Sequence, residues 1–188
     1  NQRYFSSKLF FYGLLILSLI ISNTLKSQEL IIGEERINPG IVFIFEGATK
    51  DIVYPENYNL EESLTDVHIE ARVNWDNINI PKGTPTGGFI PYLKINVIIT
   101  NQSTGFKSYI DLVPHINLID NFHYARNISL PGDIDDLYQV EFIVNNPGTY
   151  DLSYHKDWLD NYSESLIEDN VFKYIDVSFS EIARLSRR

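Results

Sequence analysis

Histidine side chains offer the clearest chemistry in this chain, which has only four of them. His115 and His123 stand eight residues apart at the ends of a segment that looks like one loop, and His68 stands two residues before Glu70. Imidazole and carboxylate groups together bind Cu(II), Zn(II), Fe(II) or Mn(II). These residues indicate a divalent-metal site, although a surface hydrogen bond is the simpler explanation for His68 and Glu70 taken alone.

Catalytic motifs are missing from the sequence. Without cysteine, the chain can form neither a thiolate zinc site nor a cysteine nucleophile, and it contains neither G-x-S-x-G nor H-E-x-x-H. The acidic run DIDD at residues 133–136 lacks the Asp/Asn/Gly spacing of a calcium loop and is better read as a solvated loop. We therefore expect a binding protein and not an enzyme.

The charge of the chain is strongly negative and unevenly distributed. The net charge is −10, but Arg3, Lys8 and Lys26 are the only charged residues of the first 27, so the rest carries 12 basic and 25 acidic residues, or −13. Such a surface repels phosphate backbones, which disfavours a nucleic-acid partner. It would attract cations, although solubility alone is a sufficient reason for it.

Residues 1–27 have the layout of an export signal. Arg3 and Lys8 precede a 13-residue apolar run at residues 9–21, and small or polar residues follow up to Ser27. The run is shorter than the roughly 20 residues that a membrane helix needs. We expect an exported protein with a cleaved signal peptide. The alternative is an uncleaved membrane anchor over residues 9–25.

Short strands separated by turns follow residue 28. Residues 65–75 alternate apolar and polar side chains, which puts His68 and Glu70 on the polar face of one strand. Other strands are expected at residues 40–47, 89–100, 106–113, 137–144, 149–158 and 171–179. The sequence thus predicts an all-β, immunoglobulin-like antiparallel β-sandwich over residues 28–180, followed by a basic tail at residues 181–188.

These elements would have to bring the histidines together. His115 follows Pro114 at the end of a strand, His123 closes the loop that returns to the sheet, and His155 lies on the polar face of the strand at residues 149–158. Positions on polar faces and at strand ends favour metal binding over core filling. From these residues alone, a three-ligand metal site and a set of surface histidines remain equally open.

Five segments of the chain, taken in order, resemble one known family. They are DVHIEA at 66–71, GGFIPYLKINVIITNQSTG at 87–105, LVPH at 112–115, HYARNISLPG at 123–132 and GTYDLSY at 148–154. Together they are similar to the periplasmic iron-transport protein family of bacteria over residues 40–155. The resemblance implies an acidic, homodimeric sandwich that binds copper and iron and accompanies an iron permease of the inner membrane.

The resemblance also implies a ligand set, which falls on His68, Glu70, His115 and His123. His115 stands where the family has a methionine, so a harder imidazole replaces a thioether and favours divalent metals. The spacing from His115 to His123 is one residue longer than in the family. A further family histidine, downstream of the last hairpin, has no counterpart in residues 160–170, and His155 does not occupy its position.

Three functions are compatible with these observations. The first is an accessory protein of iron uptake that binds a divalent copper or iron ion for delivery to an inner-membrane permease. The second is a structural subunit of another membrane complex that keeps the sandwich with a degenerate metal site. A third, less favoured function is binding of carbohydrate or protein ligands through the many aromatic residues.

Overall fold

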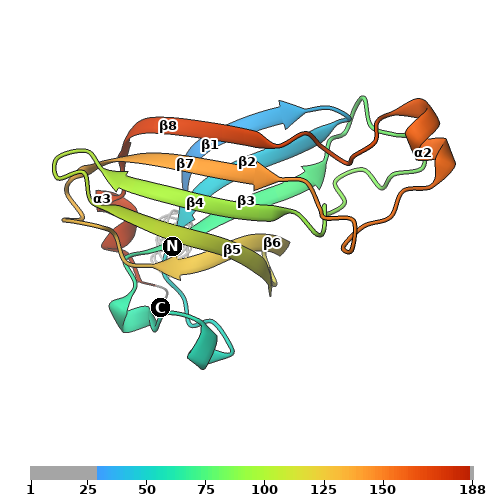
Figure 1. Cartoon of the computed structure of the whole chain (residues 1–188). Helices are drawn as coiled ribbons and strands as arrows, with labels where there is room; N and C mark the ends of the chain where they lie inside the picture. The colour runs from blue at the N-terminus through green and yellow to red at the C-terminus, as the bar shows by residue number, and fades with distance from the viewer. Residues whose placement is uncertain (1–28, 187–188) are drawn as a thin grey trace, which may run out of the picture.

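The computed structural model describes residues 29–186, whose strands form one antiparallel sheet of eight strands (Figure 1). The strands are β1 (Glu29–Ile37), β2 (Ile41–Ala48), β3 (Val67–Trp75), β4 (Lys94–Asn101), β5 (Lys107–Asn117), β6 (Asn121–Ile128), β7 (Leu137–Asn145) and β8 (Asn170–Ser178). The helices are the 3-10 turns η1 (Glu56–Tyr58) and η2 (Glu62–Leu64) and the short α-helices α2 (Lys156–Asn161) and α3 (Ser180–Ala183). The strand order is β1-β2-β3-β6-β5-β4-β7-β8.

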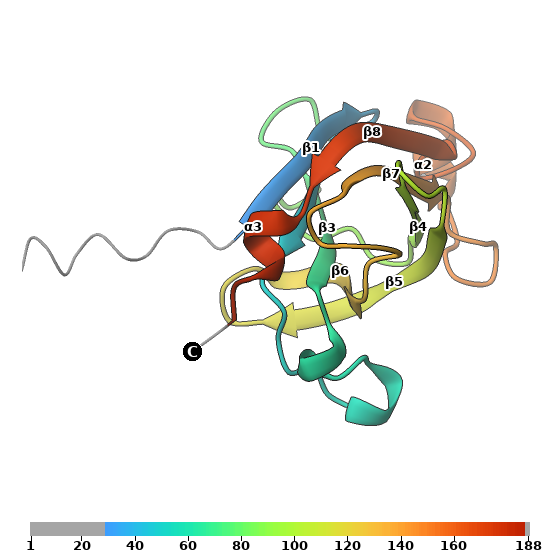
Figure 2. The same ribbon diagram turned by 90° about the vertical axis from the view of Figure 1, so that its left-hand side faces the viewer.

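The sheet curls over itself into two layers because β5 changes partners along its length. Residues 107–112 of β5 pair with β4, whereas residues 113–117 pair with β6. Figure 2 shows the strands curling around the core until the two edge strands, β1 and β8, lie side by side. The predicted all-β antiparallel fold is confirmed, with its two layers joined through β5 in a nearly closed sheet.

The core lies between the two layers and is rich in aromatic rings. Phe43 and Phe45 of β2 and Phe142 of β7 are fully buried, and the ring centroids of Phe45 and Phe142 lie 4.0 Å apart. Alternation along the strands directs these side chains inward, because successive residues of a strand point to opposite faces. Burial of this apolar surface is the main favourable contribution to the stability of the layers.

Several sequence-based assignments need correction. Residues 149–158 do not form a strand, because a turn in which Asp151 N donates to Gly148 O (2.8 Å) leads into α2. The strand that pairs with β7 at the edge of the sheet is β8. The presumed loop before His123 is a tight turn, and residues 121–128 form β6. β1 was not predicted, because a register shift between Ile31 and Gly33 interrupts its alternation.

The predicted boundaries of the domain can be compared with the structure at the C-terminal end only. Residues 181–183, assigned from sequence to the basic tail, belong to α3, which buries Ile182 and Ala183 against the core. The signal or anchor segment at residues 1–27 lies outside the described residues. Within residues 29–186, no helix is long and apolar enough to cross a membrane.

Candidate metal centre

Three neighbouring strands bring the predicted ligands onto one face of the sheet. His115 of β5 lies directly opposite His123 of β6, and His68 of β3 lies opposite Asn127 of β6. Residues two apart on a strand share a face, as do residues directly opposite each other on neighbouring strands. His123 and Asn127 of β6 therefore share a face with His68, Glu70 and His115. All four residues that the sequence proposed are brought together.

The three imidazoles are close enough to bind one ion. One ring nitrogen from each of His68, His115 and His123 lies within 4.8 Å of the other two. Glu70 Oε1 lies 3.6 Å from His68 Nε2 and 3.9 Å from His123 Nε2. Nitrogens that share a metal at about 2.0–2.1 Å are themselves about 3.3 Å apart in a tetrahedral site, so the rings would have to move closer together to share one ion.

The site is buried, although the sequence placed its residues on a polar face. His68 is 4% exposed, Glu70 1% and His123 2%, and His115 is partly buried. A cavity of about 340 Å³ adjoins the rings, between Asp51–Tyr54 of the loop after β2 and residues 114–117 of β5.

Hydrogen bonds hold the imidazoles through their Nδ1 atoms. His68 Nδ1 lies 2.7 Å from Asn127 Oδ1, and His123 Nδ1 lies 3.0 Å from the carbonyl oxygen of Asn121. The carbonyl accepts the proton of His123 Nδ1, so Nε2 of that ring carries the lone pair. Such bonds orient metal-binding histidines and raise their basicity.

The acid–base state of His115 also suits a ligand. Burial, followed by repulsion from His68, His123 and Arg126, lowers the pKa of His115 to about 4. The imidazole is therefore neutral at pH 7, which is the form that binds metals.

A second buried carboxylate, Glu46, lies beside the site and was missed by sequence reasoning. Glu46 of β2 is opposite Glu70 in the sheet and is fully buried. Arg72 donates to both of its carboxylate oxygens, each at 2.6 Å, and lies 4.0 Å from Asp120. Burial raises the pKa of Glu46, and the bonds and charge of Arg72 act against that rise. The apolar run around Glu46, GIVFIFEG, was the available signal, since an acid there is either paired or functional.

His155 does not contribute to the cluster. It is exposed and precedes the first turn of α2, outside the group of three histidines.

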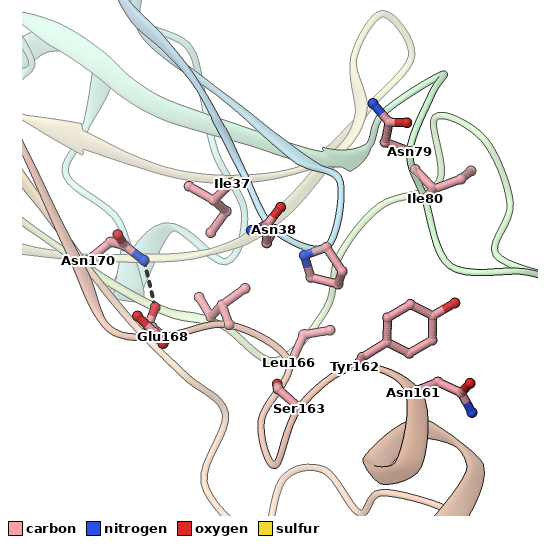
Figure 3. A pocket seen from close by; sticks show the side chains of 12 residues that line it. Ile37, Asn38, Asn79, Ile80, Asn161, Tyr162, Ser163, Leu166, Glu168 and Asn170 are labelled. Carbon is pink, nitrogen blue, oxygen red and sulfur yellow. Dashed lines mark hydrogen bonds between the residues drawn. The ribbon is translucent and has the colours of Figure 1, made fainter.

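A second cavity, of about 540 Å³, lies beside α2 and shares no lining residue with the first (Figure 3). Asn38, Asn79 and Asn161 on its wall are solvent-exposed. Solvated amides of this kind are ordinary surface groups, and nothing in this cavity resembles the buried histidine cluster.

A curled antiparallel sheet with two buried imidazoles, a third that is partly buried and a carboxylate on one face defines a metal-binding β-protein. The sequence profile of the Fe²⁺ transport protein family matches residues 26–181, and the chain belongs to that family. The resemblance drawn from the five segments is thereby confirmed. No curated protein sequence matches the chain.

Solved structures agree with this assignment. A copper-bound variant of P19 from Campylobacter jejuni is 26% identical, with a TM-score of 0.66 over 79% of this chain and 96% of P19. Copper-reconstituted P19 is also 26% identical, with a TM-score of 0.65 over 78% and 94% of the two chains. FetP of uropathogenic Escherichia coli strain F11 is 22% identical, with a TM-score of 0.64 over 79% and 94%, which shows the fold alone.

Proposed function

We propose that this chain is an exported, non-catalytic protein of iron uptake that binds one divalent copper or iron ion. The ligands are His68, His115 and His123, with Glu70 as a fourth. The observation that carries the proposal is the approach of three imidazole nitrogens to within 4.8 Å of one another on a buried face. This approach favours a working site over the alternative, a structural subunit with a degenerate one.

The choice of metal rests on the donor set and on the relatives. Three neutral nitrogens and a carboxylate oxygen suit Cu(II) and Fe(II), and their affinities differ mainly through geometry. The family transports Fe²⁺, and P19 of Campylobacter jejuni is a copper-bound relative. Imidazole in place of a thioether at His115 favours the divalent state of copper.

Metal titration tests this function directly. Apoprotein is titrated with Cu(II), Zn(II) and, under nitrogen, Fe(II), beside the double variant His115→Ala/His123→Ala and the matched control His155→Ala. We expect one tightly bound ion per chain, an affinity loss of at least about 100-fold in the double variant and no change in the control. Equal affinity in wild type and double variant would place metal binding elsewhere, and weak binding throughout would favour the structural subunit.

A periplasmic location, a homodimeric state and delivery to an inner-membrane permease complete the proposal. The turn between β5 and β6, which separates His115 from His123, carries the exposed apolar residues Leu118 and Ile119. Exposed apolar patches beside a site are typical of interaction surfaces. This hairpin tip is the surface that we propose for contact with a second copy.

Sedimentation equilibrium of the metal-loaded protein tests the hairpin tip. A Leu118→Ser/Ile119→Ser variant should dissociate at least about tenfold more readily than wild type, because it removes apolar contact area. Dimerisation as tight as in wild type would mean that the interface lies on another face.

A further inference from the structure

Asn127 makes an unusual set of hydrogen bonds for a buried side chain. It is 3% exposed on β6, and its Oδ1 lies 2.7 Å from His68 Nδ1. Its Nδ2 donates to two backbone carbonyls, Asp51 O at 2.8 Å and Leu60 O at 2.9 Å. One amide thus joins a metal ligand to both ends of the segment that follows β2.

These bonds determine which way the amide faces. An amide nitrogen has two hydrogens to donate, and both are used by the carbonyls of Asp51 and Leu60. A flipped amide would set its oxygen against these two carbonyl oxygens, so Oδ1 must face His68. That oxygen can only accept, hence His68 carries a proton on Nδ1. In the neutral ring, which is the form that binds metals, the lone pair is then on Nε2, the nitrogen on the side of Glu70.

The segment that Asn127 holds, residues 49–66, leads from β2 to β3 and returns to β6 at Asp66, whose N donates to Ile128 O at 2.8 Å. It contains η1 and η2, and most of its side chains are at least partly exposed. Arg126, the neighbour of Asn127, donates from Nη1 to Tyr58 O at 3.0 Å. Residues 51–54 of this segment line the cavity beside the histidines.

We propose that Asn127 is a positioning residue that fixes the tautomer of His68 and, with the same amide, holds the segment 49–66 over the metal centre. The proposal rests on the metal-binding function proposed above and deepens it. A cation on Nε2 makes the Nδ1 proton a stronger donor, so the bond from His68 to Asn127 tightens when metal binds. Metal binding is therefore transmitted to the segment through one side chain.

The tautomer of His68 can be measured in apoprotein, without a bound metal. Long-range ¹H–¹⁵N NMR of apoprotein distinguishes a proton on Nδ1 from one on Nε2. We expect the Nδ1–H form for His68 in wild type and in Asn127→Asp, since a carboxylate also accepts, and a mixture of forms in Asn127→Ala. An Nε2–H form in wild type would overturn the proposal, even if neither variant folds.

Amide hydrogen exchange measures how strongly Asn127 restrains the segment 49–66. The amides of Tyr58 and Asn59, bonded within η1, report on it. Their exchange should rise about tenfold in Asn127→Ala and at least as much in Asn127→Asp, which can no longer donate to the carbonyls. Arg126→Ala is the matched control: it frees Tyr58 O and raises exchange, but it leaves the His68 tautomer unchanged.

Metal-dependent exchange completes the test. Zn(II) should slow exchange in residues 55–62 of wild type and of Arg126→Ala, but not of Asn127→Ala. Equal slowing in all three would refute transmission through Asn127. If no protein binds Zn(II), Cu(II) or Fe(II), the proposed function fails, whereas the tautomer measured in apoprotein still decides the role of Asn127.

Discussion

His115 combines two properties that a metal ligand in a protein interior needs, partial burial and a neutral ring at pH 7. Its pKa is lowered to about 4, first by burial and then by the neighbouring His68, His123 and Arg126. An unfolded chain has no such environment, and its histidine titrates near the ordinary value of about 6.5. The difference between the two states links the stability of the apoprotein to pH.

The sign of this linkage follows from proton uptake. The unfolded chain binds a proton at His115 more readily than the folded chain, so the contribution to stability is full above about pH 6.5 and is lost as the pH falls toward about 4. We expect the urea concentration at the unfolding midpoint of apoprotein to decrease as the pH is lowered from about 6.5 to about 4. The drop should be smaller in His115→Gln, and an identical drop in both proteins would assign the effect to other groups.

The ion pair between Glu46 and Arg72 leads to a separate prediction about stability. Removing one member of a buried ion pair leaves an uncompensated charge, which costs about 3–5 kcal/mol. Since Arg72 is partly exposed, we expect Arg72→Met to lower the free energy of unfolding by about 2–3 kcal/mol. The double variant Glu46→Met/Arg72→Met should recover most of the loss in urea denaturation. A double variant as unstable as the single one would contradict this account.

At the scale of elements, β5 connects the fold to the site. Its first part belongs to the layer of β4, and its second part pairs with β6 and carries His115. The crossing sets His115 opposite His123, and β6 in turn places both beside β3. Any change that shifts the register of β5 by one residue would turn His115 to the opposite face.

The seam between β1 and β8 closes the curled sheet. Tyr174 of β8 donates to Glu35 of β1 at 2.9 Å, and its ring covers Gly33. A Cβ at Gly33 would overlap Tyr174 Cζ, so Gly33→Ala should displace the ring and cost about 1–3 kcal/mol. In a double-mutant cycle, Tyr174→Leu should absorb most of that cost. Additive losses would show that the ring can move freely.

For the whole molecule, the dominant long-range property is its negative charge, −13 after residue 27. A negative field raises the local concentration of cations and speeds their association, and salt screens it. The association rate of Cu(II), measured by stopped flow against a competing indicator, should fall several-fold between about 0.01 M and about 1 M salt. A rate independent of salt would assign the charge to solubility alone.

The sequence by itself determined the types of the four proposed ligand residues, the alternation that makes β3 a strand and the antiparallel all-β class. These are local properties, since a strand's side chains alternate whatever its partners are. It did not reveal β1, whose alternation is broken at Gly33, or β6, whose start looked like a loop.

Only the tertiary structure decided that β6 lies between β3 and β5. It also set the register of these strands, which brings His68, His115 and His123 together. It also decided that Glu46 pairs with Arg72 and that Asn127 holds His68. Strand order and register depend on hydrogen bonds and packing between residues far apart in the chain, and a single sequence carries no local signal for them.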